Sequence, residues 1–205
     1  MGDPKKSKKT YKTPSHPWNA TRIAEERIIT KEFGLQNKKE IWKADSYAKK
    51  INIQAKRLIR DRNLPQAVKE QKQLLERLNR LGLTEGEAQL DDVLALTLKD
   101  VLNRRLQTLV HKKGLALSSK QSRQFIVHGH ISIFGSKVTV PGYLVTKSEE
   151  ESILFNPNSS LSNEDHAERL KKKKEAPAKV KELKEVEVEL KELKEVEKIV
   201  GEVIV

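Results

Sequence analysis

Apolar side chains recur at helical spacing through the first half of the chain. Between residues 38 and 62 they follow one another every three or four positions, and lysines and arginines fill the positions between them. This pattern predicts an amphipathic, strongly cationic helix over 38–62. The same spacing predicts a helix over 20–33 behind a cap at Asn19, and another over 65–81 that opens on a proline. A glycine follows each of these two, as is common just past a helix end.

A fourth amphipathic segment follows a linker at 84–90. Asp91 and Asp92 suit the first turn of a helix, because carboxylates are stabilised at the positive end of the helix dipole. The apolar positions then keep helical spacing, which predicts one continuous helix over 91–113. Its polar side is expected to carry Asn103, Arg104, Gln107, Thr108 and His111.

After Gly114 the pattern changes from helix to strand. Ser118 and Gln121 have the spacing of a capping box, which predicts a short helix beginning at Ser119. Its inner face is expected to hold Ser122, Phe125 and Ile126, and its outer face Lys120, Arg123, Gln124 and Val127. Alternating residues, punctuated by glycine and proline, then predict short strands at 131–134, 137–140 and 143–146.

The order of these elements predicts an α+β fold class. A mainly helical domain precedes a small module in which two basic helices pack on a short antiparallel sheet. In the tail, residues 181–187 recur identically at 191–197, and the charge density of this low-complexity segment favours disorder until it is bound. The expected organisation is an extended basic arm at 1–18, the helical domain at 19–102, the module at 103–155, a loop and basic segment at 156–174, and the Lys/Glu repeat tail at 175–205.

Composition adds a strong positive charge to this picture. The net charge is +12 and the pI is near 9.7, which favours a polyanionic partner such as nucleic acid. Residues 175–205 hold six lysines and nine glutamates, a net −3, so residues 1–174 carry +15. No stretch approaches the roughly 20 apolar residues of a membrane-spanning helix, and the amino terminus lacks the apolar stretch of a secretory signal. We therefore expect a soluble intracellular protein.

Cationic and polar donors cluster around the helix predicted from Ser119 and the glycine turn after it. Phosphates could approach the backbone at Gly129, since glycine leaves that space open. A solvated basic surface is the alternative, but the basic arm, the cationic helix and the Arg104-Arg105 pair favour RNA. The expected RNA-binding donors are Lys120, Arg123, Gln124, His128, His130 and Lys137. A second expected set lies on the cationic helix and comprises Lys38, Lys39, Lys43, Lys56, Arg57 and Arg60.

Other chemistries find less support in the sequence. His128 and His130 have no third ligand nearby, so no metal site and no cofactor are expected, and the absence of cysteine excludes thiol catalysis and cysteine-ligated zinc. No phosphate-binding loop or nucleophile elbow occurs, and acids at helix starts are expected to be solvated, so no enzymatic activity is expected. The cationic helix could lie on an anionic membrane, but mutual burial of the apolar faces fits better. Trp42 is expected in the core, while Trp18 could stack on a base.

Four blocks of this sequence together resemble the archaeal form of the universal small-subunit ribosomal protein family S-four. They are Thr-Pro-Ser-His-Pro-Trp at 13–18 and the segments at 34–42, 90–108 and 119–143. The last block looks like the small RNA-binding module named after that family, which also occurs in some RNA-modifying enzymes and a tRNA synthetase. The first three blocks favour the ribosomal protein over such an enzyme.

The resemblance implies a structural protein that binds small-subunit rRNA at a multi-helix junction in its 5′ region, early in assembly. It implies a cytoplasmic place in the small subunit beside neighbouring small-subunit proteins, near the channel through which mRNA enters, and a part in decoding accuracy; mRNA would be a further partner there. No membrane and no homo-oligomer are expected, and the cysteine zinc site of some lineages is missing. A non-ribosomal assembly factor is the alternative. By motif position, the residues that would touch rRNA are Arg104, Arg105, Lys120, Gln121, Arg123, His128 and Lys137. Asn103 and Gly129 are expected RNA contacts as well.

Overall fold

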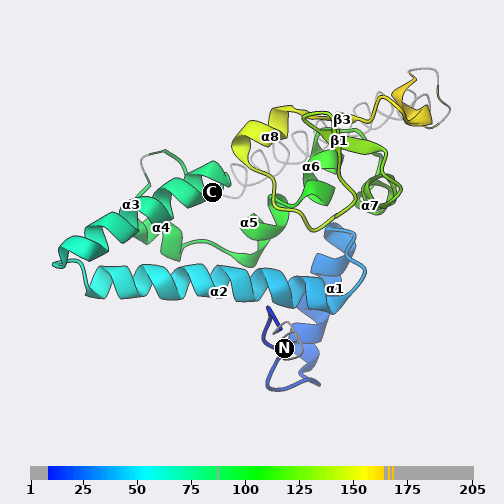
Figure 1. Ribbon diagram of the computed structural model, residues 1–205. Helices are drawn as coiled ribbons and strands as arrows, with labels where there is room; N and C mark the ends of the chain where they lie inside the picture. Colours follow the sequence, from blue (N-terminus) through cyan, green and yellow to red (C-terminus); the bar gives the residue numbers. More distant parts are fainter. Residues whose placement is uncertain (1–8, 87, 164–165, 167, 169–205) are drawn as a thin grey trace, which may run out of the picture. The chain divides into compact units, whose positions relative to one another are not determined.

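Three long helices build the N-terminal part of the protein (Figure 1). The computed structural model describes residues 9–86, 88–163, 166 and 168. Helix α1 spans Ala20–Glu32, α2 spans Lys38–Arg60 and α3 spans Pro65–Arg80, which confirms the three helices predicted from the apolar spacing. Asn19 caps α1 as predicted, since its Oδ1 accepts a hydrogen bond from the Arg22 backbone N–H at 3.2 Å.

Helix α2 is the central element and contributes to two apolar clusters. Figure 1 shows α1 at one end of α2 and α3 folding back from the other end. The first half of α2 packs on the segment after α1, and the members of that cluster are Phe33, Leu35, Ile41, Ala44, Ala48, Val101 and Leu102. The second half packs on α3, in a cluster formed by Ile51, Ala55, Leu58, Ala67, Leu74, Leu78 and Val93. The apolar stripe predicted from the sequence is therefore buried along its whole length.

The predicted single helix over 91–113 is wrong, because this segment forms three short helices. They are α4 (Leu90–Leu94), α5 (Leu98–Asn103) and α6 (Leu106–Lys112). At the first break Thr97 caps α5, and its backbone N–H donates to Asp100 Oδ2 at 2.8 Å. At the second break the Leu106 N–H donates to the Tyr143 carbonyl at 2.8 Å instead of continuing the helical ladder. A contact with a segment distant in sequence therefore ends α5 and turns the chain into α6.

The module combines α7 (Ser119–Val127), which packs against α6, with a small sheet. Strands β1 (Ile131–Ile133), β2 (Ser136–Lys137) and β3 (Ile153–Phe155) pair antiparallel in the order β2-β1-β3. The predicted strand at 143–146 is wrong. Leu144 makes an isolated bridge to Arg105, and helix α8 (Lys147–Glu151) follows it before β3. The predicted strand at 137–140 contributes only its first residue to β2.

The predicted α+β fold class is confirmed: the protein is mainly helical with one three-stranded antiparallel sheet among its described residues. The described residues as far as Asn156 form one compact unit, and a second unit begins at Pro157 with the 3-10 helix η1 (Ser160–Ser162). The boundaries expected between arm, helical domain and module remain predictions. The repeat tail predicted at 175–205 lies outside the described residues.

The amide of Gln107 ties the end of α1 to the start of α7. Gln107 was predicted on a polar outer side, but it is 1% exposed and Thr108 is buried as well, so that prediction is wrong. Its Nε2 donates to the carbonyls of Gly34 and Ser119, both at 2.9 Å, and to that of Phe33 at 3.1 Å. Gly34 has a φ of +60°, and a Cβ at this position would lie 2.8 Å from Ser119 Cβ. Glycine therefore permits the close approach that brings these three carbonyls to one amide.

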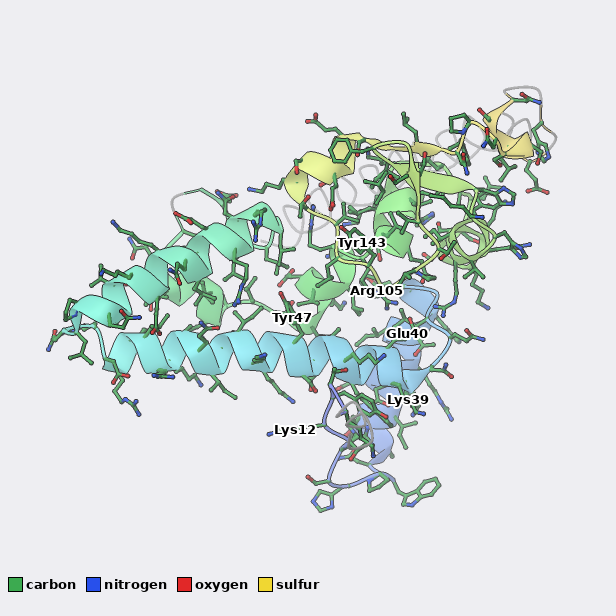
Figure 2. The ribbon with its side chains drawn as sticks, viewed as in Figure 1. Lys12, Lys39, Glu40, Tyr47, Arg105 and Tyr143 are labelled. Atoms are coloured by element: carbon green, nitrogen blue, oxygen red, sulfur yellow. The ribbon has the colours of Figure 1, made fainter. Side chains whose placement is uncertain are left out.

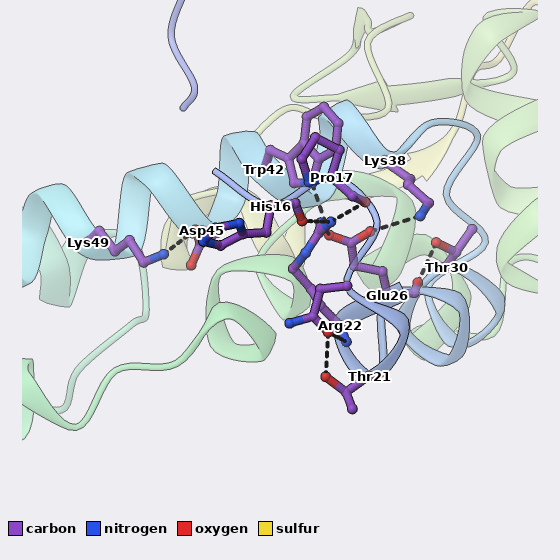
Figure 3. A network of polar contacts seen from close by, with 11 residues as sticks. His16, Pro17, Thr21, Arg22, Glu26, Thr30, Lys38, Trp42, Asp45 and Lys49 are labelled. Carbon is purple, nitrogen blue, oxygen red and sulfur yellow. Dashed lines mark hydrogen bonds and ion pairs between the residues drawn. The ribbon is translucent and has the colours of Figure 1, made fainter. Parts of the chain in front are cut away.

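A buried carboxylate joins α1 to α2 (Figure 3). Glu26 is 5% exposed, and its Oε1 accepts hydrogen bonds from Arg22 Nη1 at 2.5 Å and from Trp42 Nε1 at 3.0 Å. Lys38 Nζ lies 3.0 Å from its Oε2. Burial by itself raises the pKa of Glu26, but the hydrogen bonds from Trp42 and Lys38 and the charge of Arg22 outweigh it and lower the pKa below its usual value. The carboxylate is therefore held ionised between the two helices.

The described part of the predicted arm, residues 9–18, lies against α1 and α2. The Lys12 backbone N–H donates to Ser46 Oγ at 3.0 Å, and the rings of Tyr11 and Trp42 have centroids 6.1 Å apart. Trp42 also packs against the apolar cluster at the start of α2, as the sequence predicts for this tryptophan. The arm is thus attached to the helical framework through Trp42 as well as through α1.

We expect Gln107→Leu to destabilise the protein by about 1–3 kcal/mol, because the buried carbonyls of Phe33 and Gly34 and the partly buried carbonyl of Ser119 lose their amide donor. Urea unfolding followed by circular dichroism measures the change. Gln73→Leu, at an exposed position of α3, is the matched control and should shift stability by no more than about 0.5 kcal/mol. Equal losses in the two variants would contradict the structural role of Gln107.

Stability should also fall as the pH drops through the folded-state pKa of Glu26. A carboxyl group whose pKa is lower in the folded state contributes stability above its unfolded pKa and loses that contribution as the pH falls. Between about pH 6 and about pH 3, wild type should lose more of its free energy of unfolding than Glu26→Gln does. Urea unfolding across this range measures both, and parallel pH profiles would show that Glu26 is not the linked group.

Candidate nucleic-acid interface

The outer face of α7 carries an exposed row of hydrogen-bond donors. Lys120, Gln124 and His128 follow at four-residue intervals, from the first turn of the helix to its C-cap, and all three are exposed. Ser118 Oγ caps the helix by accepting from the Gln121 N–H at 3.2 Å, as predicted. The inner face buries the residues predicted for it, which are Ser122, Phe125 and Ile126. Packing therefore fixes α7 from within and leaves the donors to solvent.

A glycine turn places another cation at the end of α7. Gly129 has a φ of +77°, and a Cβ at this position would overlap the side chain of Lys137. Lys137 comes from β2 and is exposed. The rings of His128 and His130 are 6.3 Å apart, and His130 meets Phe125 edge-on at 6.1 Å. The structure thus brings together the donors predicted on the helix, in the turn and on the strand.

A single carboxylate holds Arg105, the N-cap of α6, and Arg123 of α7. Arg105 and Glu40 are labelled in Figure 2, and Arg105 Nη2 lies 2.5 Å from Glu40 Oε2. Arg123 Nη1 lies 3.0 Å from Glu40 Oε1. Arg123 Nη1 also donates to Gln107 Oε1 at 3.4 Å. The Arg105 side chain is 9% exposed and that of Arg123 is 25% exposed. Arg123 therefore keeps part of its surface in solvent, whereas Arg105 lies almost wholly inside.

Arg104 occupies a socket between α3 and α8. Its Nη1 lies 2.7 Å from Glu150 Oε2, and its Nη2 donates to the Val145 carbonyl at 3.1 Å. Gly82 has a φ of +68°, and a Cβ there would lie 2.9 Å from the Arg104 Cζ, so this glycine leaves room for the guanidinium. Asn103, the last residue of α5, is half-buried. Three of the predicted contact residues, Asn103, Arg104 and Arg105, therefore lie mainly between elements.

The cations predicted on α2 fall into two groups. Lys38 contacts the buried Glu26, and Arg57 and Arg60 approach Asp61 at 3.8 and 2.9 Å. The hydrogen bond from Arg60 lowers the pKa of Asp61 below its usual value. The remaining three are exposed and make no ion pair with any described acidic residue: Lys39, Lys43 and Lys56.

This arrangement supplies hydrogen-bond donors and positive charge on the outside of a rigid fold. Ammonium, amide and imidazole groups bind phosphate oxygens and ribose hydroxyls, which folded RNA presents on its surface. Within the part of the chain that the structure describes, no group of three or more His, Cys, Asp or Glu is placed to hold a metal ion. No helix among those residues has the length and apolarity to cross a membrane.

Sequence reasoning missed the two side chains that organise this interface, Glu40 and Gln107. Glu40 stands in the first turn of a helix, where a solvated acid is common, so its sequence position carries no sign of the two arginines it binds. Gln107 did have a signal, because it stands within a run of otherwise mostly apolar residues at 106–110. Its three acceptors come from segments that only the tertiary fold brings together.

Comparison with known proteins gives both a domain and relatives. The model of a family described as S4 domain matches residues 104–151. The small ribosomal subunit protein uS4 of Methanococcus aeolicus is 50% identical over 177 residues, which are 86% of this chain and 99% of that protein. The protein of the same name from Methanosphaera stadtmanae is 48% identical over 164 residues (80% and 90%), and that from Methanococcus maripaludis is 49% identical over 170 residues (82% and 95%).

These matches extend over most of this chain and over nearly all of each relative. They confirm the resemblance inferred from the four sequence blocks, including the archaeal form. The chain belongs to the uS4 family of small ribosomal subunit proteins.

Proposed function

We propose that this protein is a structural, non-enzymatic component of the cytoplasmic small ribosomal subunit, where it binds small-subunit rRNA. The names of its relatives and the S4 domain over α6, α7, β1, β2 and α8 support the proposal. The observation that carries it is the exposed row of Lys120, Gln124 and His128, with Lys137 beside its end. We call these four residues the α7 face.

The α7 face would act as a rigid template for folded RNA. Three of its four donors are carried by a helix whose inner side is buried, so their backbone is already in place and only the side chains need ordering when phosphates arrive. Lysines would bind phosphate oxygens, while the amide and imidazole groups would bind phosphates or 2′-hydroxyls. Shape and charge, rather than base sequence, would then decide which RNA is bound.

Arginines behind this face would serve mainly as positioning groups. Arg123 is bound to Glu40 but keeps a quarter of its own side chain in solvent. A phosphate can therefore bind the Arg123 guanidinium while the ion pair with Glu40 stays intact. Arg104 and Arg105 would present only their outer edges to rRNA. The exposed Lys39, Lys43 and Lys56 would extend the contact along α2. Gln121 and His130 would act at the edges of the α7 face.

The resemblance to the S-four family supports a finer proposal about place. The rRNA site would be a multi-helix junction in the 5′ region, bound early in assembly. The protein would lie beside other small-subunit proteins near the channel through which mRNA enters, with an influence on decoding accuracy. Stable co-sedimentation with mature small subunits during sucrose-gradient centrifugation tests whether the protein stays in the finished subunit. Presence only on immature particles would instead indicate an assembly factor.

Binding to small-subunit rRNA should depend steeply on salt and on the α7 face. With on the order of 10 phosphates neutralised, log affinity should fall with log salt at a slope of about −7 to −9. The double variant Lys120→Ala/Lys137→Ala should weaken binding and make the slope shallower by about 1.4–1.8. The variant neutralises two fewer phosphates, so fewer counterions are released from the RNA on binding. Filter binding to a transcript of the 5′ part of small-subunit rRNA, across a salt series, measures both values.

The matched control removes the same charge from another surface. Lys69→Ala/Lys72→Ala changes two exposed lysines of α3, which is not part of the proposed interface. Its affinity and slope should stay close to those of wild type, and both double variants should unfold at the wild-type urea midpoint. Equal effects of the two double variants on rRNA binding would show that net charge, not the α7 face, governs affinity.

A further inference from the structure

One tryptophan is displayed almost completely to solvent. Trp18 is 90% exposed, more than any other large apolar side chain in the described part of the chain. Trp42, the other tryptophan, packs against the core and donates its indole N–H to Glu26. Large aromatic side chains usually gain stability by burial, so an indole left in water gives the fold none of that gain. Its exposure therefore needs an explanation outside the fold of the free protein.

The turn that carries Trp18 is held by specific hydrogen bonds. Arg22 Nη2 donates to the carbonyl of Pro17 at 2.8 Å and to that of His16 at 3.1 Å (Figure 3). The next residue, Asn19, caps α1. Proline at position 17 further restricts the backbone. Trp18 is thus fixed on both sides along the chain, while its side chain points away from the protein.

Arg22 is itself anchored by the buried Glu26. The Arg22 Nη1 to Glu26 Oε1 distance is 2.5 Å, and the same carboxylate binds Trp42 and Lys38 from α2. A network that joins two helices therefore reaches out to two carbonyls of the turn. Such support restricts the backbone that carries the indole before any partner arrives, which lowers the entropy lost on binding.

The sequence that leads into Trp18 is suited to a polyanion. Residues 1–18 contain five lysines and one acidic residue, a net charge of +4 with histidine neutral. The first turn of α1, which directly follows Trp18, contains no acidic residue that would offset the positive end of the helix dipole. An aromatic face among cations is the combination by which proteins hold unpaired bases, since the base stacks and its phosphates meet the charge.

We infer that Trp18 stacks on an unpaired base of small-subunit rRNA, an inference that rests on the proposed function. It adds a second contact, separate from the α7 face. Helix α1 has 13 residues and is therefore about 20 Å long, and α7 packs on Gly34 just beyond its far end. An RNA that meets both points must bring an unpaired base and a helix backbone to a fixed separation, which adds selectivity for its folded shape.

Trp18→Ala tests this contact on the full chain with a transcript of the 5′ part of small-subunit rRNA. Affinity should fall roughly 5- to 150-fold, while Trp18→Phe, which keeps an aromatic ring, should lose much less. The salt slope should remain that of wild type, because no charge is removed. Ile28→Ala is the matched control: Ile28 is 64% exposed on α1, and its loss should leave affinity unchanged.

Fluorescence gives a second, direct readout. Trp42 is kept, because its indole N–H binds the Glu26 carboxylate that supports the Trp18 turn. The emission that wild type shows and Trp18→Phe lacks comes from Trp18, and stacking on a base should quench this part as the transcript is titrated. Unchanged emission, or wild-type affinity in Trp18→Ala, would overturn the inference while leaving the proposed function intact if wild type still binds. Normal rRNA affinity of Trp18→Ala with poor incorporation into subunits would assign Trp18 to a protein partner instead. Failure of the wild-type protein to bind the transcript would contradict the proposed function, and this inference with it.

Discussion

The carboxylate of Glu40 is the contact on which the arrangement of the interface depends. It lies in the first turn of α2 and binds Arg105 at the start of α6 and Arg123 on α7. A guanidinium as buried as that of Arg105 is stable only beside an opposite charge, so removal of the carboxylate would leave an uncompensated cation inside the protein. At the same place, where the end of α1 meets α7, the uncharged amide of Gln107 adds hydrogen bonds to the carbonyls of Gly34 and Ser119. The α7 face and the cationic helix α2 are therefore held by the same contacts.

Arginine and lysine have different roles in this protein. Most internal ion pairs use arginine, at positions 22, 104 and 105. The planar groups of Arg22 and Arg104 each bind two or more acceptors at once, and that of Arg105 binds Glu40. The exposed cations of the proposed interface are mostly lysines, such as Lys120 and Lys137, whose hydrated ammonium groups act as mobile point charges. This division lets a chain with a net charge of +12 fold around a few acidic residues and still present a cationic surface.

The sequence predicted the first three helices well because their apolar spacing, caps and glycine ends are all local. It failed between α4 and α6, where the second break depends on a backbone hydrogen bond from Leu106 to Tyr143. It also misplaced the third strand, since β3 follows α8 rather than Pro141-Gly142. The exposed donors of the α7 face follow from helical periodicity. The burial of Gln107, Arg104 and Arg105 does not, because their partners are brought close only by the tertiary fold.

This cationic surface is expected to bind one folded region of small-subunit rRNA. Hydroxyl-radical footprinting of that rRNA with and without the protein, across a salt series, locates the bound region. We expect localised protection at a junction in the 5′ region, lost steeply as salt rises. Protection that is diffuse along the rRNA, or absent at all salt concentrations, would contradict binding to one region and indicate a general binder of polyanions.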